Sequence, residues 1–379
     1  MNEMKKQLRF NANGKFRIML FGDLHESSDV TSPEGNAKFE DMQLLMKTAV
    51  SRLKPDLAVF MGDVFNETEN THEILDRIVK PLTDAGIPFA AVMGNHEHDK
   101  NINPIAQAYF DHPNCLCCND DPNITGKMNF NLTIKSSGSD KNAFNLWFID
   151  SNNCCMAASV SIYDWVHNDQ IEWYEKKAEE LKAENSGEPV PAVLFQHIPV
   201  TEIYEALREA KPTELYQSVK GHANRSDKRY VGNEKVIDGY VGEDPCAPQY
   251  NDGQFESWKK TGDITGAFFG HDHMNDFTCV VDGITMGQCK TAGFRCYTDG
   301  CRSCVRIVDI DENEPKKIKT KVIHFKEFGL KSKSLGPIKR TINDKQSFVL
   351  TVASRAAIGA AAVGLAATAA KIIKAVYKK

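Results

Sequence analysis

The chain has 379 residues, of which 41% are hydrophobic and 26% are charged. This composition excludes a largely disordered chain, and the length allows one large α/β domain or two ordinary ones. The first 16 residues contain no apolar segment followed by a cleavage site of small residues, so we expect a cytoplasmic protein that is not secreted. The 11 cysteines agree with a reducing compartment, because their number is odd and a chain of this size does not require disulfides.

The charge is distributed unevenly along the chain. Residues 311–379 hold 15 Lys and Arg against 5 Asp and Glu, whereas residues 1–310 hold 31 against 46. The body is therefore acidic, with a net charge of −15, and the tail is basic. Because binding to long nucleic acid usually needs a basic track, we expect no nucleic-acid partner.

The first third of the chain alternates between two hydrophobic periods. Short apolar runs at 17–21, 57–61 and 89–93 predict buried strands. Between them, hydrophobic residues recur at spacings of three and four across 39–53 and 74–82, which predicts two amphipathic helices. This order of strands and helices predicts a parallel sheet.

The rest of the chain carries further predicted elements. Apolar runs predict strands at 146–149, 193–196, 267–269, 278–281 and 304–309. A helix is expected around 169–181, and Asp282-Gly283 predicts a hairpin turn. Two polar stretches, 98–143 and 211–254, are expected to be inserted surface loops in which the choice of substrate resides.

Side chains with metal-binding chemistry follow the apolar runs in five places. They are Asp23 and His25, Asp63 after Gly62, Asn95, His96 and Glu97 after Gly94, the isolated His197, and His271, Asp272 and His273 after Gly270. Open α/β sheets place their ligand crevice at the carboxyl ends of strands, so we expect these side chains to meet. Carboxylate, amide and imidazole donors suit first-row divalent metals. The pattern predicts a dinuclear metal hydrolase.

Other residues near these motifs have weaker support as ligands. Glu97 and Asp272 are expected to support the ligands rather than to bind metal. His222 could reach the substrate, and the histidines without a motif are expected at the surface or in loops: His72, His98, His112 and His167. Cysteines could hold a structural zinc ion in two places, Cys115 with Cys117 and Cys118, or Cys296 with Cys301 and Cys304. Paired Cys-x-x-Cys units at finger-like separation are absent, which favours ordinary thiols.

The ordered series Asp-x-His, Gly-Asp, Gly-Asn-His-Glu, His and Gly-His-x-His resembles the calcineurin-like metallophosphoesterase superfamily over residues 16–310. The resemblance implies an α/β fold, the four-layer αββα sandwich with two mixed sheets, here followed by a C-terminal helical tail. It also implies which residues hold each ion. One ion would be bound by Asp23, His25, Asp63 and His273, and the other by Asp63, Asn95, His197 and His271.

A finer resemblance is to the type 29 branch of the purple acid phosphatases, carried by the segments 150–152, 196–199 and 269–277. The chain departs from true purple acid phosphatases where their metal-binding tyrosine should follow Asp63 by three residues, because Asn66 stands there. No ferric–tyrosinate absorption band is therefore expected. Manganese, iron and zinc, in divalent or trivalent form, all stay open as cofactors.

These observations predict that phosphomonoesters are hydrolysed by attack of a metal-bridging hydroxide. The substrate would be a phosphorylated small molecule or a phosphoprotein. The resemblance implies that Asp63, Asn95 and His96 carry catalysis, that Asn95 also touches the phosphate, and that His96 protonates the leaving oxygen; His222 is a weaker candidate for substrate contact. Two alternatives stay open: a phosphodiesterase acting on a nucleotide or a lipid headgroup, and a scaffold protein without catalysis.

The chain beyond residue 310 is expected to differ from this domain. Proline and glycine punctuate a lysine-rich stretch at 311–346, which predicts a basic linker, and the alanine-rich stretch 347–379 predicts a helix. Its uncharged run has 15 residues, short of the about 20 that span a bilayer. Lys371, Lys374 and Lys378 share one face, so the helix could lie on an anionic membrane surface; a membrane anchor and packing against a partner stay open.

Overall fold

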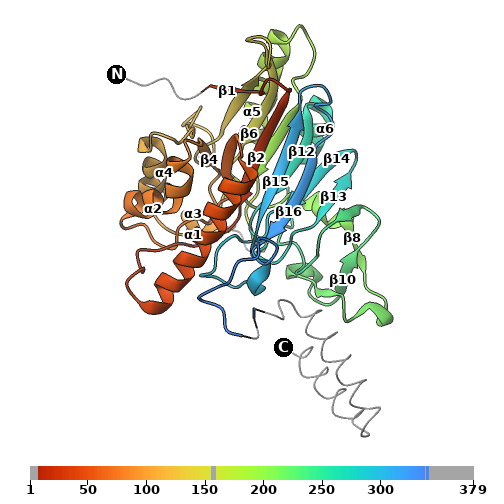
Figure 1. Cartoon of the computed structure of the whole chain (residues 1–379). Helices are drawn as coiled ribbons and strands as arrows, with labels where there is room; N and C mark the ends of the chain where they lie inside the picture. The colour runs from red at the N-terminus through yellow and green to blue at the C-terminus, as the bar shows by residue number, and fades with distance from the viewer. Residues whose placement is uncertain (1–6, 155–158, 338, 341–379) are drawn as a thin grey trace, which may run out of the picture.

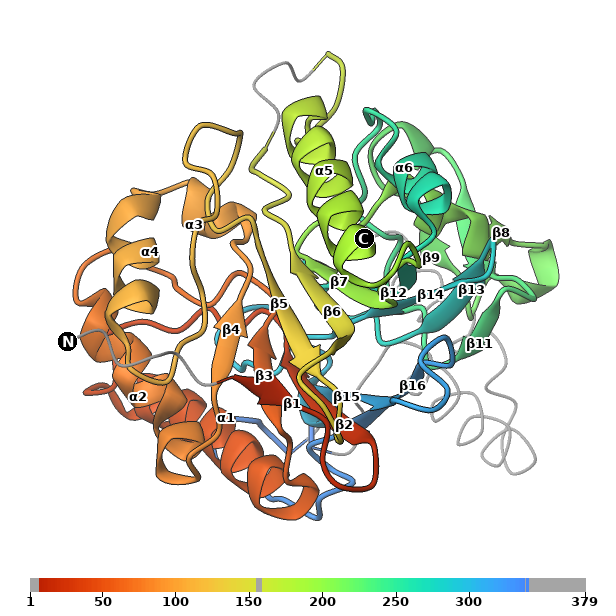
Figure 2. The ribbon, with the colours of Figure 1, turned by 90° about the horizontal axis from the view of Figure 1, so that it is seen from above.

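Two β-sheets packed face to face, with helices outside each, form the body of the protein, and Figure 2 shows the four layers edge-on. A computed structural model of the chain describes residues 7–154, 159–337 and 339–340 (Figure 1). The five-stranded sheet has the order β16-β15-β2-β3-β4, and the eight-stranded sheet has the order β1-β5-β6-β7-β12-β14-β13-β11. Both sheets are mixed, which confirms the expected αββα sandwich.

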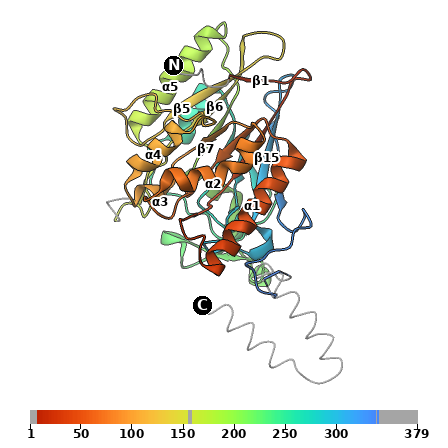
Figure 3. The same ribbon diagram turned by 60° about the vertical axis from the view of Figure 1, so that its left-hand side comes forward.

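The five-stranded sheet contains the predicted parallel unit. It consists of β2 (Lys15–Phe21), β3 (Leu57–Phe60) and β4 (Phe89–Ala91), joined by α1 (Pro33–Leu53) and α2 (Thr71–Asp84). Figure 3 shows α1 and α2 across the outer face of this sheet. Helix α1 begins where the Ser32 hydroxyl accepts the Gly35 N–H at 3.0 Å, with Pro33 in the first turn, where a missing N–H costs nothing.

The eight-stranded sheet brings together strands from the whole length of the chain. They are β1 (Leu8–Arg9), β5 (Phe130–Lys135), β6 (Asn142–Phe148), β7 (Ala192–Gln196), β11 (Val236–Asp238), β12 (Ile264–Phe269), β13 (Thr278–Val281) and β14 (Ile284–Gln288). Helices α5 (Asn168–Glu184) and α6 (Gln254–Thr261) cover its outer face (Figure 2). Asp282 and Gly283, with φ of 46° and 84°, form the predicted hairpin turn between β13 and β14.

The alternation of side chains along the strands divides the core into two clusters. On β6, Leu146 and Phe148 point into the layer between the two sheets, and Trp147 points toward α5 and α6. This is the two-residue period of a strand whose two faces are both buried. The second cluster includes Trp173 and Trp258 from the helices themselves.

Both stretches that were expected to be surface loops contain regular elements. Residues 98–143 include α4 (Ile102–Asp111) and β5, and residues 211–254 include β11 and part of a three-stranded sheet. The strands of that sheet are β8 (Leu207–Glu209), β9 (Val219–Lys220) and β10 (Arg229–Gly232). In the part of the chain that the structure describes, 3-10 helices lie at Thr201–Ala206, Pro212–Glu214, Ala223–Arg225 and Gly300–Arg302. Strands β8, β9 and β10 are short and carry charged side chains, so they lack the alternation of apolar and polar residues by which a strand is predicted.

The expected linker at 311–346 is wrong for its first part. Strand β16 (Lys319–His324) pairs antiparallel with β15 (Cys304–Asp311), and the Ser332 hydroxyl donates to buried Asp41 on α1 at 2.6 Å. Strand β16 lies at the edge of its sheet, where lysines prevent pairing with other chains. Because a basic linker is also rich in lysine, the composition alone did not distinguish the two. The expected helix at 347–379 lies outside the described residues. Within the described part, every helix is too short or too polar to cross a bilayer.

Candidate metal centre

The predicted ligands converge between the carboxyl ends of strands from both sheets. From the five-stranded sheet, Asp23 and His25 follow β2, Asp63 follows β3, and Asn95 begins α3 (Asn95–His98) after β4. From the eight-stranded sheet, His197 follows β7, and His271 and His273 follow β12. Neither sheet alone supplies a complete set of ligands. The face-to-face packing of the sheets therefore creates the site.

The side chains fall into two groups that share Asp63. In the first, one ligand atom from each of four residues lies within 4.8 Å of the other three: Asp23, His25, Asp63 and His273. In the second, Asp63, His197 and His271 meet the same criterion, and Asn95 Oδ1 lies 3.1 Å from His197 Nε2. The seven residues thus gather into the two sets of ligands that the resemblance implied.

Strained backbone aims several of these side chains. Asp23, His25, Asp63 and His271 have φ of 46°, 48°, 51° and 71°, in the left-handed region that residues other than glycine seldom adopt. The preceding glycines are needed for space: a Cβ on Gly94 would lie 2.2 Å from Asp63 Oδ1. Strain at four ligands in one place is typical of a functional site whose surroundings hold it in position.

Glu97 holds the turn that carries Asp63. Its side chain is buried, and its Oε2 accepts the N–H groups of Asp63 and Gly94, both at 2.8 Å. Its Oε1 accepts the N–H groups of Val64 and Phe65 at 2.6 and 3.0 Å. Glu97 lies in neither ligand group, and it supports the ligand instead.

Hydrogen bonds to backbone carbonyls orient two of the imidazole rings. His197 Nδ1 donates to the Met61 carbonyl at 2.7 Å, and His273 Nδ1 donates to the Tyr297 carbonyl at 3.0 Å. Each Nε2 therefore faces the centre of the site. This arrangement is typical of histidines that ligate metals. The Tyr297 ring also stacks on His273, with ring centroids 4.1 Å apart.

The donor groups fit a pair of cations. Burial lowers the pKa of His25 to about 4 and that of His273 to about 3, so both rings are neutral and able to ligate. Burial opposes charge on His197 too, but the carboxylate of Asp63 raises its pKa to about 10. Asp23 Oδ2 and His271 Nε2 are buried with no hydrogen-bond partner among the described residues. A metal ion would satisfy these groups and replace the positive charge on His197.

The predicted catalytic histidine lies at the mouth of the site. His96 Nδ1 is 3.2 Å from Asp99 Oδ2, and His96 Nε2 is 4.0 Å from Asp63 Oδ2. The His96 side chain is 44% exposed, so a substrate could reach it. Asp99 escaped the sequence analysis, although its spacing of three residues from His96 within one helical turn was a usable signal.

His222 lies beside the second ligand group rather than in it. Its ring stacks on Tyr163 with centroids 5.8 Å apart, and Tyr163 meets His271 edge-on at 4.4 Å. The Nε2 atom of His222 is buried without a hydrogen-bond partner among the described residues. His98, which was expected at the surface or in a loop, instead pairs with buried Asp150 at 2.8 Å.

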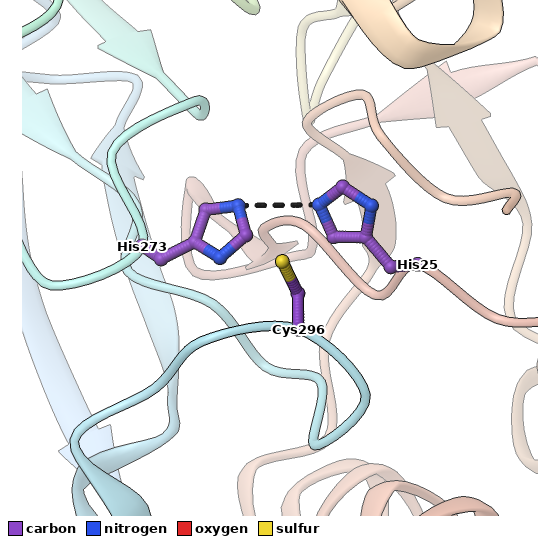
Figure 4. A group of neighbouring side chains, drawn as sticks. All are labelled: His25, His273 and Cys296. Carbon is purple, nitrogen blue, oxygen red and sulfur yellow. Dashed lines mark hydrogen bonds between the residues drawn. The ribbon is translucent and has the colours of Figure 1, made fainter.

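A cysteine that the sequence analysis placed elsewhere also reaches the site. One ligand atom each of His25, His273 and Cys296 lies within 4.8 Å of the other two, and Figure 4 shows the thiol pointing between the two rings. Among the described residues, no metal-binding group contains Cys296 with Cys301 or Cys304. The structural zinc site considered for these cysteines is therefore not formed.

The family model described as calcineurin-like phosphoesterase matches residues 16–275. The chain belongs to this family. The family relationship agrees with the four layers and with the two groups of possible metal ligands found above.

Several curated relatives of this calcineurin-like phosphoesterase are plant proteins. "Probable inactive purple acid phosphatase 14" of Arabidopsis thaliana is 29% identical over 80% of this chain and 77% of its own. "Probable inactive purple acid phosphatase 29" of the same plant is 25% identical over 83% and 81%. "Phosphatase DCR2" of Saccharomyces cerevisiae is 24% identical over 82% of this chain and 54% of its own.

Solved structures of low sequence identity are similar as well. A dimetal phosphatase from Danio rerio is 12% identical, covers 82% of this chain and 99% of its own, and has a TM-score of 0.42. A phosphatase from Mycoplasma pneumoniae is 12% identical, covers 82% and 93%, and has a TM-score of 0.41.

Proposed function

We propose that this protein is a phosphoesterase that uses two metal ions to hydrolyse phosphomonoesters. The observation that carries the proposal is the convergence of seven donor residues from both sheets into two groups that share Asp63. A pair of divalent ions, held by these residues, would acidify a water molecule and shield the negative charge of a phosphoryl group. The substrate class proposed is a phosphorylated small molecule or a phosphoprotein.

Residues of the chain would supply the remaining steps. Asp63 Oδ2 lies 3.2 Å from His197 Nε2 and 3.8 Å from His25 Nε2, so one carboxylate faces both groups. The Asn95 amide can donate to a phosphoryl oxygen while its Oδ1 serves the second group. His96, oriented by Asp99, is placed to give a proton to the departing alkoxide oxygen.

The word "inactive" in the names of the plant relatives describes those proteins. In this chain, the position of the tyrosine expected in purple acid phosphatases is Asn66, whose side chain hydrogen-bonds to His25. This replacement removes a phenolate ligand but none of the seven residues in the two groups. We therefore propose a catalytic protein without a tyrosinate-coloured centre.

The test is reconstitution of the purified full chain with manganese, zinc, iron or magnesium, followed by metal analysis and assays on an aryl phosphate monoester and diester. We expect two ions per chain and preferential hydrolysis of the monoester. Asp63→Asn and His271→Ala should reduce turnover to background while circular dichroism stays unchanged. The control is His72→Ala, which removes an exposed histidine paired with Asp111.

Three outcomes would contradict the proposal. Full activity of His271→Ala would show that hydrolysis does not require the metal centre. Preferential hydrolysis of the diester would make the protein a phosphodiesterase. Two bound ions without hydrolysis of any ester would favour a scaffold protein that retains the metals.

A further inference from the structure

The segment between β14 and β15 is fixed against the ligand turn that follows β2. The Thr291 hydroxyl donates to the Asp23 carbonyl at 2.7 Å, and the Ala292 N–H donates to the Gly22 carbonyl at 2.8 Å. A Cβ on Gly293 would lie 2.5 Å from the Leu24 carbonyl oxygen, so the two backbones are in close contact. The position of this segment relative to Asp23 is therefore well determined.

Cys296 is held from both sides within that segment. Before it, Arg295 pairs with buried Glu26 at 2.5 Å. After it, Tyr297 stacks on His273 and accepts the hydrogen bond of its Nδ1. The thiol consequently has a defined direction, toward the His25 and His273 rings (Figure 4).

The groups around the thiol are themselves arranged for a cation. His25 Nε2 and His273 Nε2 face each other at 3.1 Å, and His273 Nε2 lies 3.6 Å from Asp23 Oδ1. Asp23 is fully buried, and its Oδ2 has no hydrogen-bond partner among the described residues. The cysteine thus faces two nitrogen donors of the first ligand group, and the same group contains a buried carboxylate oxygen that has no hydrogen-bond partner among the described residues.

We propose that Cys296 is a thiolate ligand of the metal ion held by Asp23, His25 and His273. The inference rests on the dinuclear centre of the proposed function but not on catalysis by it. On binding, the thiol would release its proton to solvent as the sulfur–metal bond forms. A soft thiolate favours zinc or iron over magnesium and manganese, whereas the other ion has only nitrogen and oxygen donors. The two ions would therefore differ in their metal preference.

The test is the absorption spectrum of the full chain reconstituted with two equivalents of cobalt(II). Wild-type protein is expected to show a near-ultraviolet band from charge transfer between thiolate and cobalt. The band should vanish in Cys296→Ser, which should also bind one of its two zinc ions at least about tenfold more weakly. The matched control, Cys154→Ser, removes another exposed cysteine and should keep the band.

A second measurement needs no variant. Iodoacetamide labelling of wild-type protein, followed by peptide mass spectrometry, should show Cys296 reacting at least about tenfold more slowly after metal loading, with Cys154 unchanged. The inference is overturned if the cobalt protein lacks the band, if Cys296→Ser keeps it, or if metal leaves the labelling rate of Cys296 unaltered. Hydrolysis without the band would leave the proposed function standing, and the band without hydrolysis would leave the thiolate ligand standing.

Discussion

The two sides of the metal centre both rest on buried carboxylates, but the structure compensates their charge differently. On the side of the five-stranded sheet, Glu97 is surrounded by four backbone N–H groups. On the side of the eight-stranded sheet, Lys290 contacts Asp276 at 2.9 Å and Asp299 at 2.8 Å, with all three side chains buried. Backbone N–H groups thus compensate the buried negative charge on one side, and a lysine side chain compensates it on the other.

Both of these charge-compensating arrangements are connected to the predicted metal ligands. Glu97 holds the turn of Asp63, the residue shared by both groups. Asp276 lies three residues after His273, and Asp299 lies two residues after Tyr297, which orients the His273 ring. Arg302 and His324 add to the compensation of Asp276 at 3.4 and 2.9 Å. Backbone donors cannot be deleted by one substitution, whereas Lys290 can, so the second side should be the more vulnerable one.

The largest expected effect comes from Lys290→Met. The variant leaves Asp276 and Asp299 buried and still 3.4 Å from Arg302, with His324 beside Asp276, but without the lysine that contacts them at 2.9 and 2.8 Å. Removing one partner of a buried ion-pair network is strongly destabilising, so we expect the free energy of unfolding to fall by about 3 kcal/mol. Urea unfolding of wild-type and variant protein measures this loss. Lys259→Met is the control, since it removes an exposed pair with Asp282 and should cost less than about 1 kcal/mol. Equal losses in the two variants would refute the role assigned to the buried cation.

Glu97→Gln should have a smaller effect on folding and a clear effect on metal binding. The amide keeps the shape of the side chain, but its NH2 group would face N–H donors, which costs about 1 to 3 kcal/mol of stability. Metal affinity should fall about 10- to 100-fold, because the turn of Asp63 loses its support. Isothermal titration with zinc tests this, with the exposed Glu172→Gln on α5 as the control. Unchanged affinity would show that the turn of Asp63 keeps its conformation without the carboxylate of Glu97.

The smallest effect concerns a pair that links the two sides. Burial alone lowers the pKa of His98, but the charge and hydrogen bond of Asp150 raise it above 6.5. The folded pKa exceeds the unfolded one, so this stabilisation is complete below about pH 6.5 and is lost as the pH rises through the folded pKa. Between pH 6 and 9, wild-type protein should therefore lose more of its free energy of unfolding than His98→Gln does in urea titrations. Parallel pH profiles would contradict the pairing.

The sequence was informative wherever strand ends and local motifs coincide. Asp63 and His271 could be placed at a common edge because apolar runs precede them, and Asp282-Gly283 could be placed in a turn from its need for positive φ. These are local signals. Each depends on a few adjacent residues and on one rule of backbone geometry.

The features that escaped prediction depend on contacts distant in sequence. Strand β16 resembles a linker until its pairing with β15 is known, because edge strands carry lysines. Cys296 follows no strand end and has no motif around it, and it reaches His25 only because 289–293 packs against the turn after β2. The sequence of neither segment, taken alone, predicts that contact.

The most direct test of the central claim is anomalous X-ray diffraction from crystals of the metal-loaded protein. We predict two peaks about 3.5 to 4 Å apart, with Asp63 between them. One should lie against Asp23, His25 and His273, and the other against Asn95, His197 and His271. A single peak, or metal bound away from these residues, would contradict a site built jointly by the two sheets.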